Sequence, residues 1–189
     1  MANRSSSKLE KKVKHVMIDI ETLGTSRKAS ILSIGACIFT IEDGIGEVFE
    51  VNLKPDGRNV DPDTVRWWLK QEKNAIDKLF DPEPINHKDA REALTKFLEK
   101  NKPKKIWANG ALFDLNILRD AYNEYPPWRY SQEMCMRSVR TLGDYIGLSY
   151  GQWWVDNNCD DDIQHGALDD AIRQAKYVIH IFKNCQELP

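Results

Sequence analysis

Two carboxylates stand two residues apart near the start of the chain, where they could hold a metal ion. Asp19 and Glu21 lie at the end of the apolar, β-branched segment 16–20, which predicts a strand. Side chains two apart on a strand face the same side, so these carboxylates would repel each other. A divalent cation relieves that repulsion, and hard oxygen ligands suit Mg²⁺ or Mn²⁺. A solvated acidic turn is the simpler interpretation, and the pair alone leaves both open.

Asp114 is a second acidic candidate, at the start of a helix expected over residues 112–123. The helix follows a short apolar strand at 105–108. Helical spacing places Asp114 on one stripe with Ile117 and Leu118. A carboxylate beside an apolar stripe is costly unless it is paired or coordinated. The alternative is an ordinary helix-start acid, which the helix dipole stabilises.

A histidine and two adjacent acids open the last expected helix, residues 167–182. His165 is the side-chain type best suited to accept a proton near neutral pH, although a plain helix start has the same composition. Only one of Asp169 and Asp170 can serve as a ligand. Arg173 lies four residues after Asp169, a spacing typical of a solvated, charge-paired face. This spacing favours Asp170 as the ligand.

The elements that must position these residues are indicated by periodicity and by turn residues. Short β-branched segments predict strands that begin as two antiparallel hairpins. Asp61-Pro62 resembles a helix start, and the last helix has a strong 3.6-residue apolar period. Strands followed by alternating helices and strands predict one mixed α/β domain over residues 13–189, after a basic tail of residues 1–12. We expect strands at 16–20, 31–39, 48–53 and 105–108, helices at 61–70, 87–99, 112–123 and 167–182, and a long loop at 145–164 with room for one helical turn.

Composition limits the class of protein. The chain has 189 residues, 41% of them hydrophobic, which suffices for one domain with a sizeable core. Its formal net charge of −2 argues against a basic protein that coats nucleic acid, although bound cations can reverse the charge locally. Four scattered cysteines suggest neither a zinc knuckle nor a disulfide framework. With no apolar run of about 20 residues and no signal-like start, we expect a cytoplasmic protein without a membrane partner.

The candidate residues occur in the order of a known set of motifs. VMIDIETLGT, ANGALFDLNIL and HGALDDA closely resemble the three motifs of the DEDDh exonucleases, the histidine-containing branch of the DnaQ-like superfamily. RWWLKQ also resembles a phage and bacterial subgroup that includes exonuclease A and relatives of exonuclease VIII. The resemblance covers residues 14–182. It implies a ribonuclease H-like fold, in which three antiparallel strands are followed by parallel ones and helices flank the mixed sheet.

The resemblance also implies an activity. Asp19, Glu21, Asp114 and Asp170 would hold two divalent cations, Mg²⁺ or Mn²⁺, and the His-x4-Asp spacing selects Asp170 over its neighbour. His165 would orient or deprotonate the attacking water. The expected enzyme is a metal-dependent 3′–5′ exonuclease that cuts single-stranded DNA or RNA to nucleoside 5′-monophosphates in a bacterial or phage-infected cell, with a homodimer plausible.

Seven further residues are candidates for substrate contact. By resemblance, the backbone after the first motif would cradle the terminal nucleotide. Trp68 shares an apolar helical face with Leu69 and is expected in the core. Trp67 falls off that face and could stack on an unpaired base, although core packing is the favoured role for the pair. Phe113 is open to both roles, and Asn109 either contacts substrate or caps a turn. The candidates are Ile20, Thr22, Leu23, Trp67, Trp68, Asn109 and Phe113.

Charged segments outside the motifs are assigned more simply. Arg137 and Arg140 are placed for phosphate contact, whereas the acidic residues 160–162 should face away from nucleic acid. Four lysines are expected to be solvated at the far end of the sheet from the site: Lys100, Lys102, Lys104 and Lys105.

Two other classes of protein compete with the enzyme. A catalytically silent binding domain of the same fold would be expected to lack one or more of the five site residues, and all five are present. A zinc hydrolase acting on small molecules would be expected to have a histidine-rich ligand set, which this chain lacks.

Overall fold

A five-stranded mixed sheet forms the centre of the computed structural model, which describes residues 12–80, 83–157 and 165–186. The strand order is β3-β2-β1-β4-β5. The first three strands pair antiparallel, and β4 and β5 run parallel to β1, which confirms the predicted mixed sheet. The strands are β1 (His15–Thr22), β2 (Ile31–Thr40), β3 (Gly44–Asn52), β4 (Lys105–Ala108) and β5 (Glu133–Cys135).

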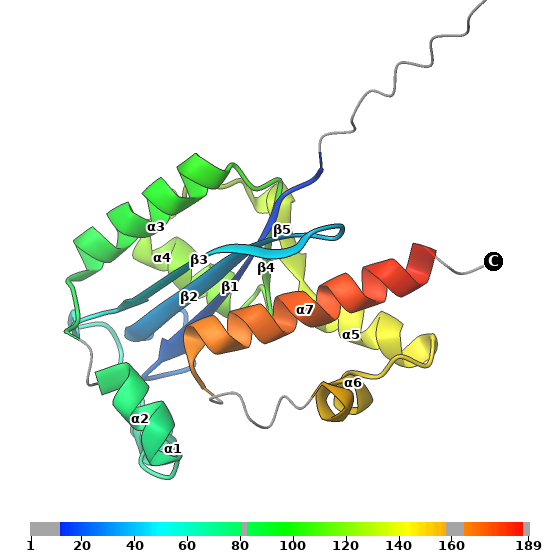
Figure 1. Ribbon diagram of the computed structural model, residues 1–189. Helices are drawn as coiled ribbons and strands as arrows, with labels where there is room; N and C mark the ends of the chain where they lie inside the picture. The colour runs from blue at the N-terminus through cyan, green and yellow to red at the C-terminus, as the bar shows by residue number, and fades with distance from the viewer. Residues whose placement is uncertain (1–11, 81–82, 158–164, 187–189) are drawn as a thin grey trace, which may run out of the picture.

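Helices cover both faces of the sheet (Figure 1). α3 and α4 pack on one face, and α5, α6 and α7 pack on the other. α1 and α2 lie beyond the ends of β1 and β2, beside the start of α7 (Figure 1). The helices are α1 (Pro62–Trp68), α2 (Lys73–Phe80), α3 (His87–Asn101), α4 (Asp114–Ala121), the 3₁₀ turn η1 (Tyr130–Gln132), α5 (Met136–Tyr145), α6 (Tyr150–Asp156) and α7 (Ala167–Gln186).

Alternation along β1 decides which side of the sheet carries the acids. Every residue of β1 is buried. Ile18 and Ile20 pack into the core beneath α3 and α4, whereas Met17 packs beneath α5 to α7. Side chains alternate along a strand, so Asp19 and Glu21 lie on the same side as Met17. They therefore face α7, the helix that carries the third motif.

Gly35 in β2 lets the start of α7 approach the sheet. A Cβ at Gly35 would lie 2.2 Å from the carbonyl carbon of Ala167 and 2.2 Å from the nitrogen of Leu168. Because these atoms are backbone, only movement of the helix could make room. This close approach brings the first turn of α7 to the end of β1.

Gly35→Ala should therefore destabilise the protein by roughly 1–3 kcal/mol, the usual cost of forcing an extra methyl into a packed core. Urea unfolding would measure the change. Gly151→Ala is the matched control, since a Cβ at Gly151 meets nothing within 4 Å and alanine favours a helix. Equal stability of both variants would contradict the tight packing of α7 on β2.

Several elements differ from the sequence predictions. α2, β5 and α5 were not predicted, and α6 is a seven-residue helix inside the region expected to be loop. α2 was not predicted because only two of its side chains, Ala75 and Leu79, are buried. The tail at residues 1–11 and the acidic residues 160–162 lie outside the described residues. No helix among the described residues is long and apolar enough to cross a membrane.

Candidate active site

Three acidic side chains from two motifs are buried together at the end of β1. Asp19 and Glu21 come from the strand, and Asp114 is the first residue of α4. The backbone N–H of Ile20 donates a hydrogen bond to the Asp114 carboxylate, which fixes α4 against the strand. The first two motifs thus meet as predicted.

Burial and mutual repulsion disturb the protonation of this cluster. Burial raises the pKa of Asp19 to about 7, although a hydrogen bond from Gln174 and the charge of Arg173 oppose the shift. The pKa of Glu21 is raised well above its usual range by burial and then by the charges of Asp19 and Asp114. Burial and the charge of Asp19 likewise raise the pKa of Asp114. The nearby arginine charges do not cancel these shifts, so the three buried carboxyls have too little positive charge around them when no cation is bound.

The third motif joins the cluster from α7. Glu21, His165 and Asp170 each place one potential ligand atom within 4.8 Å of the others. His165 precedes the helix and has a left-handed backbone with φ of 63°. Burial lowers the pKa of its ring, and the charge of Arg173 lowers it further. The five residues selected from the sequence thus lie at one end of the sheet.

The pairing expected for the two adjacent acids is wrong. Asp169 was expected to pair with Arg173 on a solvated face, but Arg173 is only 4% exposed and pairs with Asp170. Asp169 instead forms an ion pair with Lys78 of α2. The error arises because α6 covers this part of α7: the Arg173 guanidinium lies 4.3 Å from the centre of the Trp154 ring.

Gln174 is a site residue that sequence reasoning did not assign. It is buried, and its Nε2 donates a hydrogen bond of 2.8 Å to Oδ1 of Asp19. Its position four residues after Asp170, on the same helical stripe, was the available signal. A hydrogen bond of this kind orients a carboxylate that serves as a ligand.

A pocket of about 440 Å³ opens beside the acids. It contains five of the seven predicted substrate contacts: Ile20, Thr22, Trp67, Trp68 and Phe113. It also contains residues that the sequence did not single out: Gly24, Thr25, Asp61, Asp63 and Thr64. Asp61 was recognised only as the cap of α1, a role it does fill.

The two tryptophans of α1 differ in burial, and core packing, the role favoured for the pair, holds for Trp68 alone. Trp68 is 4% exposed, and its Nε1 donates a hydrogen bond of 2.9 Å to the Thr22 carbonyl. Trp67 is 42% exposed and meets the His165 ring edge-on, with ring centres 4.7 Å apart. Leu69, which the helical period placed on the same apolar face as Trp68, is 76% exposed.

Two predicted contacts lie outside the described lining of the pocket. Leu23 packs instead against the small cluster of Leu32, Trp68 and Leu79, so its contact with substrate stays a prediction. Asn109 follows β4 and is also absent from the lining.

The basic residues considered for phosphate contact lie in different places. A Cβ at Gly110 would lie 3.0 Å from the Arg137 guanidinium. The positive charge of Arg137 lowers the pKa of Asp114 and so partly opposes its raised value. Arg140 instead stacks 4.5 Å from the centre of the Tyr150 ring. Lys105 pairs with His15 at the first residues of β4 and β1, so the lysines around it lie at the opposite end of the sheet from Glu21.

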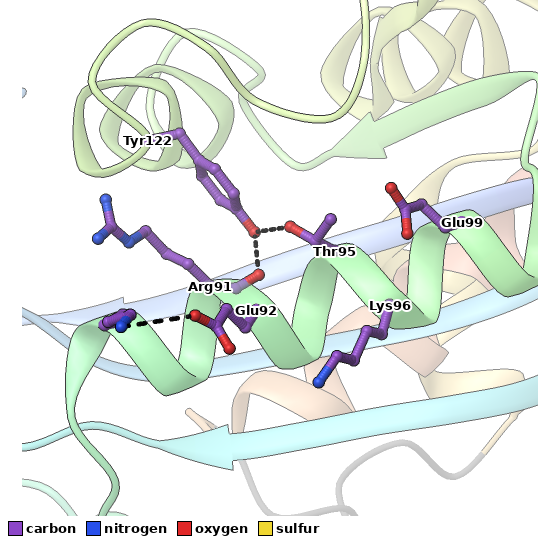
Figure 2. A pocket seen from close by; sticks show the side chains of 7 residues that line it. Arg91, Glu92, Thr95, Lys96, Glu99 and Tyr122 are labelled. Atoms are coloured by element: carbon purple, nitrogen blue, oxygen red, sulfur yellow. Dashed lines mark hydrogen bonds and ion pairs between the residues drawn. The ribbon is translucent and has the colours of Figure 1, made fainter.

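A second pocket, of about 470 Å³, lies between α3 and α4 (Figure 2). The Tyr122 hydroxyl donates a hydrogen bond of 2.8 Å to the Arg91 carbonyl and also contacts the Thr95 hydroxyl; Figure 2 marks both interactions with dashed lines. Arg91 Nη1 donates to the Ala121 carbonyl at 2.7 Å. These polar groups bind one another, and none of the five candidate residues lines this pocket, so we do not assign it a role in the site.

Comparison with known proteins agrees with the geometry. The model of the family described as the 3′-5′ exoribonuclease Rv2179c-like domain matches residues 14–182. No curated protein matches the chain.

Solved structures match at low identity. The nuclease domain of 3′hExo, a DEDDh family member bound to rAMP, is 12% identical with a TM-score of 0.64, over 95% of this chain and 96% of that one. E. coli exonuclease I in complex with a dA16 oligonucleotide is 15% identical with a TM-score of 0.64, over 92% of this chain and 41% of that one. This chain thus spans about two fifths of exonuclease I. The predicted ribonuclease H-like fold is confirmed.

Proposed function

This chain belongs to the family of the 3′-5′ exoribonuclease Rv2179c-like domain and is a 3′–5′ exonuclease, and we propose that it degrades single-stranded RNA to nucleoside 5′-monophosphates with two divalent cations. The observation that carries the proposal is the meeting of Glu21, His165 and Asp170 within 4.8 Å, beside the buried Asp19 and Asp114. We propose RNA as the substrate in preference to DNA because the family is described as an exoribonuclease domain. The narrower phage and bacterial subgroup suggested by RWWLKQ stays a prediction, as does a homodimer.

The donor set fits hard divalent cations such as Mg²⁺ or Mn²⁺. Asp19, Glu21, Asp114 and Asp170 would hold them, because buried carboxylates with raised pKa values need positive charge nearby. When bound, a pair of such cations lowers the pKa of the attacking water and stabilises the departing 3′ oxygen. Gln174 fixes one oxygen of Asp19 and thereby orients that carboxylate.

His165 would accept the proton of the attacking water. Its pKa is lowered by burial and by Arg173, so the ring is neutral and able to accept a proton at neutral pH. The ring lies beside Glu21 and Asp170 on one side and against Trp67 on another. That arrangement holds the base next to both the acids and the pocket.

The pocket would receive the base and sugar of the 3′-terminal nucleotide. Its described lining contains acidic side chains and neither lysine nor arginine, which suits an uncharged occupant better than a phosphate. Trp67 and Phe113 offer aromatic surface for stacking on the base. Arg137, beside Gly110 and Asp114, would contact a backbone phosphate outside the pocket.

Trp67→Ala should raise KM for a single-stranded substrate by roughly 5- to 150-fold, since stacking on one base is worth about 1–3 kcal/mol. Steady-state kinetics with a short oligoribonucleotide would measure KM and kcat separately. Trp67→Phe should restore most of the affinity, and Leu69→Ala, at the exposed residue that caps the end of α1, should change neither value. An unchanged KM in the alanine variant would exclude stacking by Trp67.

The proposed reaction is tested on 3′-labelled single-stranded RNA and DNA of equal length. We expect release of the 3′-terminal nucleoside 5′-monophosphate with Mg²⁺ or Mn²⁺, faster on RNA, and none with EDTA. Asp114→Asn serves as the inactive control for contaminating nucleases. No metal-dependent release from either substrate would contradict the proposed function, whereas faster cleavage of DNA would overturn the choice of RNA.

A further inference from the structure

α2 is fastened at one end to the sheet and to the start of α7. The buried Asn52 of β3 donates from Nδ2 to the carbonyl oxygens of Lys78 and Leu79, at 2.8 and 3.0 Å. The Lys78 ammonium lies 2.5 Å from Oδ2 of Asp169 and 3.3 Å from Oε1 of Glu50. The ammonium thus joins β3, α2 and α7 at one point.

This ion pair lies directly against the residue that follows His165. A Cβ at Gly166 would lie 2.8 Å from Oδ2 of Asp169 and 3.1 Å from Nζ of Lys78. The Gly166 carbonyl accepts the N–H of Asp170 at 2.8 Å, which begins α7. Gly166 therefore supplies the space in which the ion pair can close over the backbone.

His165 needs such support from outside its own segment. Its left-handed backbone, with φ of 63°, costs on the order of 1–3 kcal/mol in a residue other than glycine. Its ring meets the rings of Trp67 and Trp68 edge-on, with centres 4.7 and 6.1 Å away. Residues 62–80, called the α1–α2 arm below, thus contact the His165 segment through the tryptophans and again through Lys78.

We propose that the Lys78–Asp169 ion pair is a positioning device that holds His165 at the acids, an inference that rests on the proposed function. Asp169 is then a positioning residue, and Asp170 beside it is the ligand. The pair is more than half buried, with side chains 22% and 31% exposed, so removing one partner leaves a poorly solvated charge. The same α1–α2 arm walls the substrate pocket, so one element serves both the base and the pocket.

The test compares four variants with one control on the same helix. Asp169→Asn and Lys78→Met each break the pair, their combination completes a double-mutant cycle, and Lys78→Arg keeps the charge. Asp77→Asn is the control, because Asp77 pairs with Lys73 on the exposed side of α2. For each protein we would measure kcat, KM, Mn²⁺ affinity by calorimetry, and the His165 ring resonance by NMR, assigned with His165→Ala.

We expect either single substitution to lower kcat by roughly 10- to 100-fold, the scale of a small misplacement of a catalytic group. Mn²⁺ affinity should stay close to wild type, whereas the melting temperature should fall because the charge left behind is poorly solvated. The His165 resonance should lose the shift that the tryptophan rings induce. The kcat of the double variant should be no lower than that of the less active single variant, because the two residues act as one unit. Lys78→Arg and Asp77→Asn should remain near wild type.

Wild-type kcat and an unmoved His165 resonance in Asp169→Asn would overturn the inference and leave the proposed function standing. Loss of Mn²⁺ binding in Asp169→Asn would also overturn it, because Asp169 would then be a ligand. If the wild-type protein has no exonuclease activity, the proposed function fails, and the NMR comparison still decides whether the pair positions His165.

Discussion

Replacing His165 by alanine should slow hydrolysis by roughly 10²–10⁴-fold, the contribution of a general base, while Mn²⁺ affinity changes little. The physical reason is that four carboxylates remain to hold the cations, whereas the group that accepts the proton is gone. Single-turnover cleavage of labelled RNA gives the rate of the chemical step. Calorimetric titration with Mn²⁺ gives the affinity.

The matched control for this variant is His180→Ala, further along α7, where the ring packs near Trp153 and Tyr177. It should retain the wild-type rate. A more than tenfold loss of Mn²⁺ affinity in His165→Ala would contradict the assignment as base and make His165 a ligand. That alternative is meaningful because His165 lies within 4.8 Å of the Glu21 and Asp170 ligand atoms.

Replacing Asp19 by asparagine should abolish metal-dependent activity and stabilise the metal-free protein by roughly 1–4 kcal/mol near pH 8. Burial raises the pKa of Asp19 to about 7, so the folded state binds a proton that the unfolded chain has already released. Its contribution to stability is fully present below the ordinary carboxyl range and is lost as pH rises through about 7. Asparagine removes this pH dependence and can still accept the hydrogen bond from Gln174.

Urea unfolding in EDTA at several pH values between 5 and 8 measures this effect. The stability of the wild-type protein should fall with rising pH, and the curve of Asp19→Asn should be flatter. Adding Mn²⁺ should stabilise the wild type and leave Asp19→Asn unchanged. Asp77→Asn, at a surface pair on α2, should follow the wild type in both experiments. A less stable Asp19→Asn protein in EDTA would contradict the account of a cluster strained by its own charge.

The central site could be predicted because each motif lies at the end of an element with a clear pattern. The acids of β1 follow a β-branched strand, Asp114 opens α4, and His165 precedes the long amphipathic α7. Strand alternation then places Asp19 and Glu21 on the side of α7. Local periodicity placed each candidate at the end of an element, and the resemblance to the three motifs joined the candidates into one site.

The supporting contacts could not be predicted because they join distant parts of the chain. Lys78 and Asp169 are 91 positions apart, and α2 was not recognised as a helix at all. Arg173 was assigned to a solvated face because a helical stripe does not reveal that Trp154 of α6 covers it. The helical period misled in the opposite direction at Leu69, which it placed on the same apolar face as Trp68 and which is nevertheless exposed to solvent.

Mn²⁺ titration of the wild type, Asp170→Asn and Asp169→Asn tests the central claim most directly, because the two acids are adjacent and only one should hold a cation. We predict two Mn²⁺ sites in the wild type, at least tenfold weaker binding in Asp170→Asn, and unchanged binding in Asp169→Asn. Weakened binding in Asp169→Asn together with normal binding in Asp170→Asn would contradict the proposed metal site.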